Sequence, residues 1–433
     1  MFDLELSYSI LLVLCLAAAC VFEFVNGFHD TANAVATVIY TNSLKPWVAV
    51  IWSGFMNSLG VFLGGITVAM GIVNLLPVET LVDQNIAHSI SMVAALLLSA
   101  IFWNLLTWYF GIPCSSSHTL IGSILGVGIA YSLLPESVGD AVNWGKAQEI
   151  GLSLLISPLF GFTMVIILMF LLRTITKDTP SGDDLFKEPK KNAPPPPWIR
   201  GILLITCTLV SFFHGQNDGQ KGVGLVMLIL IGIVPGYFAL NGKMETSSMI
   251  SPLKKIEVHI NAIDSSTLAQ SDRIKLAESL KMNQRLQQQF TTNENLEEIP
   301  KEKRFDVRKD LLVMNRNITG LLKKEEVRMS DKDKDSMKGS LKSLRKATDY
   351  SPGWVIVMIS LSLGCGTMIG WKRIVKTIGE KIGKQHLTYA QGASAELVAA
   401  STIGLSSYYG LPVSTTHVLS SGIAGSMVAS KGI

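Results

Sequence analysis

GIPCSSSH at residues 111–118 and GLPVSTTH at residues 410–417 are two copies of one motif. NGFHDTAN at residues 26–33 and HGQNDGQK at residues 214–221 form a second pair, and both pairs keep the same order along the chain. The copies of the first pair lie further apart than those of the second. The extra distance equals the length of the segment 241–351. This pattern predicts an internal duplication whose second copy carries that segment as an insertion.

The charged residues are concentrated in the same segment. Of the 433 residues, 48% are hydrophobic and only 16% are charged, against about 25% charged in ordinary soluble domains. Residues 241–351 hold 39 of the 70 charges. The charges that remain are too few to cover the rest of the chain as a soluble globule. We therefore expect a membrane body and a solvated insert, whose interleaved acids and bases do not indicate nucleic-acid binding.

Apolar segments of about the length that crosses a bilayer, roughly 20 residues, recur along the chain. The predicted fold class is all-α, a polytopic membrane protein with a helical soluble insert. Cysteines lie only in apolar stretches, so no disulfide framework is expected. The predicted parts are transmembrane repeat 1 (1–173), a Pro-rich cytoplasmic linker (174–197), the first part of repeat 2 (198–240), the insert (241–351) and the second part of repeat 2 (352–433).

Loop charges predict how the two repeats are oriented. Loop 77–87 has two acidic residues and no lysine or arginine, whereas loop 372–387 carries five basic residues and one acid. The positive-inside rule then puts the first loop outside and the second in the cytoplasm. Corresponding loops on opposite faces are the signature of inverted-topology repeats in secondary transporters. By the same rule the insert 241–351 is extracytoplasmic.

The Ser/Thr-His motifs predict broken or re-entrant helices. Each follows a Gly-x-Pro turn near the middle of an apolar segment, and proline suits the first turn of a new helix. Irregular backbone at membrane depth persists only where it is buried or lines a cavity. Hydroxyls and backbone N–H groups at such helix N-termini make an anion site. The alternative is ordinary N-capping, but a cap uses one hydroxyl. The candidate hydroxyl residues are Ser115, Ser116, Ser117, Ser414, Thr415 and Thr416.

Five charged residues remain inside apolar segments, and a charge at mid-membrane by default marks a functional site. Asp30 and Asp218 match between the copies, whereas Glu23, Glu396 and Lys221 do not. Buried ion pairing is the alternative, weighed most heavily for the two glutamates. Carboxylates repel an oxyanion unless a cation or proton lies between them, so these residues favour coupled transport over a simple anion pore.

Histidines of the motifs are further candidates. His118 and His417 match each other and either relay protons or are neutral and bonded to backbone carbonyls. His29 and His214 do not align, so no symmetric role is expected for them. Small-residue spacing at Gly60, Gly64 and Gly65, and at Gly122, Gly126 and Gly128, predicts close helix packing.

The four motif stretches resemble the inorganic phosphate transporter (PiT) family, and most closely its bacterial low-affinity symporters. The matching stretches are GFHDTANAVATVIYT (27–41), GIPCSSSHTLIG (111–122), HGQNDGQKGVGLVMLILIG (214–232) and GLPVSTTHVLSS (410–421). The resemblance implies phosphate import across the bacterial cytoplasmic (inner) membrane by symport. In bacterial members the substrate is often a metal–phosphate complex and the driving ion a proton. In sodium-coupled relatives the matched residues line phosphate and Na⁺.

Carried over residue by residue, the substrate-binding candidates are Asp30, Asn33, Ser115, Ser116, Ser117, Asn217, Asp218, Lys221, Ser414, Thr415 and Thr416. The coupling candidates are Asp30, Asp218, Glu396, Glu23, His118 and His417. Lys221 stands where the family usually has a second asparagine, which disfavours a symmetric pair of Na⁺ sites and favours H⁺ coupling. No resident cofactor or fixed metal site is expected, and no enzymatic activity.

Several alternatives stay open at this point. The same fold could carry sulfate, or could couple phosphate to Na⁺. Two alternatives belong to other functional classes. One is an intramembrane hydrolase that uses a serine and a histidine of the motifs, and the other is a receptor whose insert binds a partner. The partners expected are phosphate, the lipid bilayer and a second copy in a homodimer. A counterpart of the segment 150–173 would begin near residue 449, beyond Ile433, so repeat 2 is expected to lack its last helix.

Overall fold

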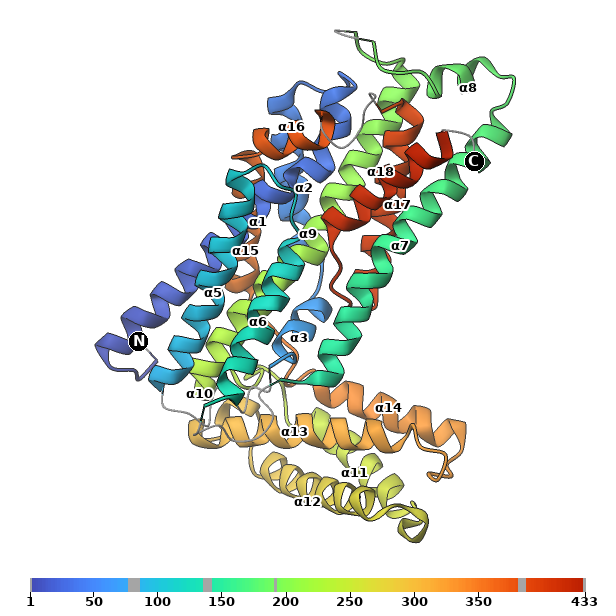
Figure 1. The fold of residues 1–433 in the computed structure, drawn as a ribbon. Coiled ribbons are helices and arrows are strands. Elements are labelled where there is room, and N and C mark those ends of the chain that lie inside the picture. The colour runs from blue at the N-terminus through green and yellow to red at the C-terminus, as the bar shows by residue number, and fades with distance from the viewer. Residues whose placement is uncertain (1, 77–85, 135–141, 191–192, 381–386, 431–433) are drawn as a thin grey trace. The chain divides into compact units, whose positions relative to one another are not determined.

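The computed structural model describes residues 2–76, 86–134, 142–190, 193–380 and 387–430 (Figure 1). These residues form helices, turns and loops without a β-strand, and one isolated bridge joins Glu245 and Asn295. The all-helical class predicted from the sequence is therefore confirmed. The chain divides into two compact units: a helical body (4–229 and 351–433), and an insert unit (230–350) that also holds Phe2 and Asp3.

Twelve described helices belong wholly or mainly to the helical body. They are α1 (Leu6–Tyr40), α2 (Pro46–Leu63), α3 (Thr67–Val73), α5 (Ile86–Tyr109), α6 (Ser116–Ser132), α7 (Trp144–Ile175), α8 (Pro180–Leu185), α9 (Pro197–Ile233), α15 (Gly353–Met368), α16 (Lys372–Glu380), α17 (Tyr389–Tyr408) and α18 (Thr415–Ser430).

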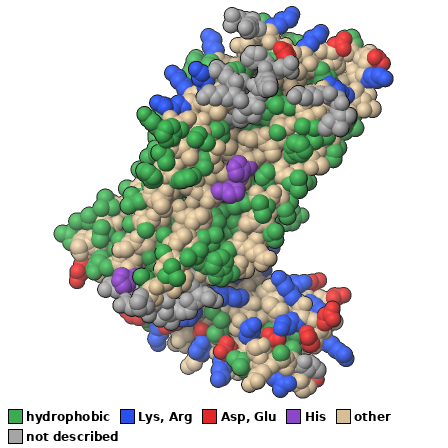
Figure 2. All heavy atoms as spheres, viewed as in Figure 1, with side chains coloured by type: hydrophobic (Ala, Val, Ile, Leu, Met, Phe, Trp, Pro, Cys, Tyr) green, Lys and Arg blue, Asp and Glu red, His purple; other side chains and the backbone are tan. Residues whose placement is uncertain are grey.

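Five of the described helices are long and apolar enough to cross a bilayer: α1, α2, α5, α7 and α9. A further helix, α15, is apolar but shorter. Large apolar side chains such as Leu155, Phe102 and Leu133 are exposed along the body, and Figure 2 shows apolar side chains spread over it among uncharged groups. Water would not support such a surface, so the body is a membrane protein.

Helix α1 extends well beyond the apolar stretch in which it begins. It continues through Gly27 and Asp30 to Tyr40 without interruption. The breaks fall elsewhere, at the loops that precede α6 and α18, where Gly111 and Gly410 adopt positive φ angles of 66° and 71°. A residue with a β-carbon is strained in that conformation. Within the segment 174–197, predicted to be a linker, α8 forms one short helix.

Two close helix crossings build the body. A β-carbon on Gly60 of α2 would lie 2.0 Å from the carbonyl oxygen of Phe212 in α9, and one on Gly215 would lie 2.1 Å from that of Asn57. In the second crossing, Gly366 of α15 packs against the backbone of Phe24 in α1. Helix α9 runs through the middle of the body (Figure 1). Its side chains bond to α2 through Ser211 and Ser53, and to α17 through Thr206 and Glu396.

The insert unit has its own apolar core. Its helices are α10 (Pro235–Phe238), α11 (Ser247–Asn261), α12 (Gln270–Thr292), α13 (Lys301–Leu321) and α14 (Asp331–Arg345), with short 3₁₀ turns at Ser265–Thr267 and Leu296–Glu298. Each long helix buries a mainly apolar face of leucine, isoleucine, methionine or phenylalanine, and the opposite face carries the charges seen in Figure 2, as an amphipathic helix requires.

A buried arginine contacts the backbone near both ends of the insert unit. Arg308 of α13 is 1% exposed and donates to the carbonyl oxygens of Ala239 and Thr348, at 3.0 and 2.8 Å. The backbone N–H of Asn241 also donates to Ala347, at 2.8 Å. The first and last residues of this unit therefore lie close together. Such an insertion can be accommodated in one repeat without separating the helices on either side of it. The burial of Tyr350 at the exit raises the pKa of its hydroxyl to about 12.

Candidate functional site

The first part of the site lies where α1 meets the start of α18. Asp30 is 2% exposed, and its Oδ1 accepts a 2.5 Å hydrogen bond from Thr416. Asn33, one helical turn further, donates to both, at 3.3 Å to Asp30 and 3.0 Å to Thr416. Thr416 also donates to the carbonyl oxygen of Cys114, in the loop before α6, at 3.3 Å. A buried carboxylate is thus tied to a neighbouring helix N-terminus by a hydroxyl and an amide.

The second part lies where α9 meets the start of α6. The Lys221 ammonium is 2% exposed and donates to Asp218 Oδ1 at 2.7 Å, to Ser117 at 2.5 Å and to the carbonyl oxygen of Val413 at 2.9 Å. Ser117 itself donates to Val413, at 2.7 Å. Here an ammonium group fills the space between the carboxylate, the hydroxyl and the backbone carbonyl.

These two parts are made of residues at matched positions of the two motif pairs. Asp218 matches Asp30, Lys221 matches Asn33, Thr416 matches Ser117 and Val413 matches Cys114. Each carboxylate lies beside the helix start of the other half of the chain, and each hydroxyl bonds to the carbonyl that precedes the other helix. Among these matched positions, the asparagine-to-lysine difference is the one that changes a charge.

His214 connects the two carboxylates. Its Nε2 lies 3.6 Å from Asp30 Oδ2 and 3.6 Å from Asp218 Oδ2, and its ring is 3% exposed. One ligand atom from each of these three residues lies within 4.8 Å of the others. The sequence comparison set His214 aside because it does not align with His29. Its position one helical turn before Asp218 was the available signal.

The hydroxyls of the two serine/threonine runs, 115–117 and 414–416, have different roles. Ser115 and Ser414 are N-caps, accepting from the N–H groups of His118 and His417 at 3.2 and 3.1 Å. A single cap in each run leaves two hydroxyls for other partners. Ser117 and Thr416 take the contacts described above.

The middle hydroxyls, Ser116 and Thr415, are buried and have no hydrogen-bond partner among the described residues. They occupy matched positions of the two motifs, in the first turns of α6 and α18. A buried hydroxyl without a partner costs about 1–3 kcal/mol. Two such groups at the N-termini of neighbouring helices are suited to bind an anion there.

The histidines that follow these runs face each other. The rings of His118 and His417 lie 4.8 Å apart, and His118 Nδ1 pairs with Ser115 Oγ at 2.8 Å. Both histidines are exposed at the body's surface. In Figure 2, histidine side chains emerge amid the apolar face of the body.

The remaining candidates surround this centre. Asn217 donates to Ser407 at 2.9 Å and accepts from the N–H of Val413 at 3.2 Å, so it holds the loop before α18 in place. Glu23 is fully buried beside Gly222, whose missing side chain makes room for its carboxylate. Glu396 is also fully buried and accepts from Thr206 at 2.5 Å. Glu23 lies within electrostatic range of Asp30, Asp218 and Lys221, whereas Glu396 bonds to Thr206 of α9; neither belongs to the close group of Asp30, His214 and Asp218.

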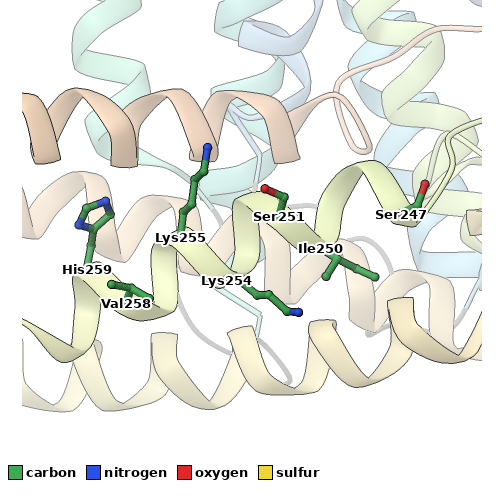
Figure 3. A pocket seen from close by; sticks show the side chains of 7 residues that line it. All are labelled: Ser247, Ile250, Ser251, Lys254, Lys255, Val258 and His259. Carbon is green, nitrogen blue, oxygen red and sulfur yellow. The ribbon is translucent and has the colours of Figure 1, made fainter.

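The insert unit carries a separate groove of about 510 Å³ along α11. Its lining residues are Ser247, Ile250, Ser251, Lys254, Lys255, Val258 and His259. Figure 3 shows that these side chains leave one helix in different directions, with Lys254 and Lys255 pointing apart. They do not converge on a common point, so the groove lacks the geometry of an anion site.

Residues 26–433 match the sequence model of the Phosphate transporter family. The chain belongs to this family. It is 40% identical to the low-affinity inorganic phosphate transporters PitB and PitA of Escherichia coli, over 99% of this chain and 91% of each relative. A probable low-affinity inorganic phosphate transporter of Bacillus subtilis is 28% identical over 98% of this chain and 86% of that protein.

The resemblance inferred from the four motifs is thereby confirmed, and the family is one of transporters rather than enzymes. A solved structure titled "The sodium-dependent phosphate transporter" aligns with a TM-score of 0.54 over 97% of this chain and 90% of that one. At 18% identity this likeness concerns the fold alone.

Proposed function

We propose that this phosphate transporter family member imports inorganic phosphate with low affinity across a bacterial inner membrane, by cation symport. The observation that carries the proposal is the pairing of two buried carboxylates, Asp30 and Asp218, with two helix N-termini that present unpartnered buried hydroxyls, Ser116 and Thr415. The N-termini attract an oxyanion. The carboxylates repel it unless a cation or a proton accompanies it, so phosphate enters together with positive charge.

Matched backbone conformations and contacts in the two halves of the chain support an inverted repeat around this site. Positive φ angles recur at Gly65 and Gly370, both 76°, and at Gly111 and Gly410, in each case just before a helix of the corresponding half. Helix starts from one half meet carboxylates of the other, which is how repeats share a central transporter site. We infer alternating access by motion of the two halves around it. The loops 77–87 and 372–387, which gave the predicted orientation, lie partly outside the described residues.

The choice of coupling ion rests on one difference between the two halves of the site, the lysine at position 221 against the asparagine at position 33. Lys221 supplies a fixed positive charge beside Asp218, so a mobile cation is needed only on the Asp30 side. We propose a proton as that cation, with Na⁺ as the second candidate. Asp30 and Asp218 adjoin the substrate, whereas Glu23, Glu396, His118 and His417 are the candidates for carrying protons to and from it.

Uptake into proteoliposomes tests the proposal. Radiolabelled phosphate should accumulate when an inward pH gradient is imposed, and should equilibrate without accumulating when no gradient is present. Accumulation driven by Na⁺ alone would transfer the coupling role to Na⁺. If neither gradient drives accumulation by protein that is folded and inserted, coupled transport is wrong.

Sulfate is the alternative anion, and competition separates the two. Phosphate carries a proton near neutral pH and can donate to Asp30 or Asp218, whereas sulfate cannot. We therefore expect excess sulfate to leave phosphate uptake unchanged while excess unlabelled phosphate suppresses it. Equal suppression by both would assign the site to divalent oxyanions in general.

A further inference from the structure

Glu23 is a fully buried carboxylate that forms no ion pair with another described residue. Its Oε2 accepts a hydrogen bond from the Asn26 amide at 3.2 Å, whereas its Oε1 has no partner among those residues. A β-carbon on Gly222 would lie 2.5 Å from Oε1, so this oxygen faces the backbone of α9. A buried charge without a partner is costly, and in a membrane protein it marks a functional group by default.

The charges that act on Glu23 belong to the phosphate site. They are Asp30, two turns further along α1, and Asp218 and Lys221 of α9. Cys20, one turn earlier on α1, is the other titratable group beside it. Helices α2, α5 and α15, which also pack against α1, carry no Asp, Glu, Lys or Arg. Three carboxylates and one ammonium give this group a net charge of −2, and protonation of Glu23 changes it to −1, which favours an anion.

Glu23 and Lys221 are both unmatched between the two halves of the chain. Ser211 stands at the position that corresponds to Glu23, and its hydroxyl donates to Ser53 at 2.9 Å. Asn33 stands at the position that corresponds to Lys221. The two unmatched residues therefore set the charge of the site together. The lysine contributes a permanent charge, and the glutamate contributes one that a proton can remove.

Unpartnered amide atoms mark a route for water to Glu23. Asn26 Oδ1 and both amide atoms of Asn104 in α5 are buried without a hydrogen-bond partner among the described residues. Helices α1 and α5 pack together and run in the same direction (Figure 1), with His29 Nε2 at 3.3 Å from Thr107 Oγ1. Asn26 and Asn104 each come three residues before this contact, so they lie at one level on the facing sides. Buried amides of this kind commonly hold ordered water.

We propose that Glu23 carries the coupling proton and exchanges it at Oε1 through water held by Asn26 and Asn104. When the site is open to the outside, a hydronium ion gives its proton to Oε1 and leaves as water. When the site is open to the cytoplasm, the new O–H bond breaks and a water molecule takes the proton away. Phosphate binds beside the neutral carboxyl and is repelled by the ionised one, so proton and anion move together.

This inference rests on the proposed function and selects one of its candidate proton carriers. The other candidates are less closely connected with the carboxylate pair. Glu396 accepts from Thr206, on the side of α9 that faces α17. His118 and His417 are exposed at the surface of the body. Glu23 combines full burial with the field of Asp30 and Asp218.

The experiment compares two modes of transport in proteoliposomes. One is phosphate accumulation driven by an imposed pH gradient, and the other is exchange of labelled external for unlabelled internal phosphate without a gradient. Glu23→Gln keeps the shape of a neutral carboxyl but cannot release a proton. We expect exchange to continue at the wild-type rate and accumulation to be lost. Glu149→Gln is the control, because Glu149 is exposed and pairs with Lys146, and it should retain both modes.

Asn104→Leu tests the water route, and keeps the proposal testable if Glu23→Gln does not fold. It removes both amide atoms at similar size, so exchange should continue while gradient-driven accumulation slows. Ser157→Ala is its control, since it removes a buried hydroxyl of α7 that also has no partner among the described residues. Accumulation at the wild-type rate in Asn104→Leu would overturn the water route.

Two results in folded Glu23→Gln would overturn its role. Retained accumulation would show that the proton travels elsewhere, and loss of exchange together with accumulation would assign the residue to phosphate binding or packing. In the first case the wild type still accumulates phosphate, so symport stands and this inference alone is wrong. If the wild type accumulates phosphate under neither a pH nor a Na⁺ gradient, the proposed function itself is wrong. Accumulation by the wild type with Na⁺ alone would remove the proton from Glu23 and leave phosphate symport intact.

Discussion

Lys221 is the residue at which the two halves of the site differ chemically. Its ammonium has three oxygen neighbours within 2.5–2.9 Å: Ser117 Oγ, Asp218 Oδ1 and the Val413 carbonyl. In the other half, two of the matched oxygens, Asp30 Oδ1 and Thr416 Oγ1, accept from the amide of Asn33, which carries no charge. Under the proposed symport, a lysine in the place of a mobile cation would remove one ion from each transport cycle, because its charge cannot leave with the substrate.

The substitution Lys221→Asn should therefore create a dependence on Na⁺. Removing one partner of a buried ion pair costs about 3–5 kcal/mol, and we expect uptake without Na⁺ to fall by more than about tenfold. Added Na⁺ can occupy the vacated space among the same oxygens and restore uptake. The measurement is phosphate uptake against Na⁺ concentration, with Lys146→Asn as control, since the ion-pair partner of Lys146 among the described residues is the exposed Glu149. A variant that is insensitive to Na⁺ at full activity would refute the built-in cation.

Asp218→Asn tests the carboxylate that this lysine accompanies. The amide cannot balance the ammonium and cannot accept a proton, so we expect phosphate uptake to be abolished while folded, membrane-inserted protein is retained. Gel filtration and the amount of inserted protein give the folding control. Asp264→Asn, an exposed change in the insert, should leave uptake at the wild-type rate. Wild-type uptake by Asp218→Asn would remove Asp218 from the site.

Helix packing around the site depends on positions where a side chain cannot fit. Sequence spacing predicts close packing at both glycine groups, and the structure shows it at Gly60 and Gly64 but not at Gly65, Gly122 or Gly126. A β-carbon on Gly60 would lie 2.0 Å from the Phe212 carbonyl, whereas one on Gly122 in α6 meets nothing within 4 Å among the described residues. The packing prediction for Gly122 is therefore wrong within this chain. Spacing alone does not reveal which face of a helix has a neighbour.

The pair Gly60→Ala and Gly122→Ala measures this difference. Gly60→Ala should separate α2 from α9 and displace Asn57, which lies one turn away, so we expect loss of inserted, monodisperse protein. Gly122→Ala replaces glycine by a better helix former in open space, and should be neutral or stabilising by up to about 1 kcal/mol. Thermal unfolding followed by fluorescence-detected gel filtration compares them. Equal behaviour of both variants would contradict the crossing of α2 and α9.

The elements of the site could be predicted from the sequence to different degrees. Internal repetition identified Asp30, Asp218 and the two hydroxyl runs without any structure. His214 and Asn104 were not found, since repetition selects what the halves share and these two residues belong to one half only. Their roles come from contacts of α1 with α9 and α5, which no periodicity in the sequence encodes.

At the scale of the whole molecule, the charged block and the transport site belong to different compact units. Every residue proposed to touch phosphate or its cation lies in the helical body, between Glu23 and Lys221 or after residue 351. The insert unit holds its own core, and Arg308 bonds to backbone carbonyls near both of its ends. The site's geometry therefore does not require the insert.

Replacing residues 242–346 with a short Gly/Ser linker should consequently preserve phosphate uptake. The flanking residues Asn241 and Ala347 are already joined by a 2.8 Å backbone hydrogen bond, so a few residues suffice to reconnect the chain. We expect the same dependence on the pH gradient as in the full chain, measured in proteoliposomes at matched protein density. Arg308→Met in the full chain is the companion variant. It leaves two buried carbonyls without their donor, at about 1–3 kcal/mol each, and should loosen the insert unit alone. Loss of uptake in both, with the body still folded and inserted, would make the insert a gating element of the transporter.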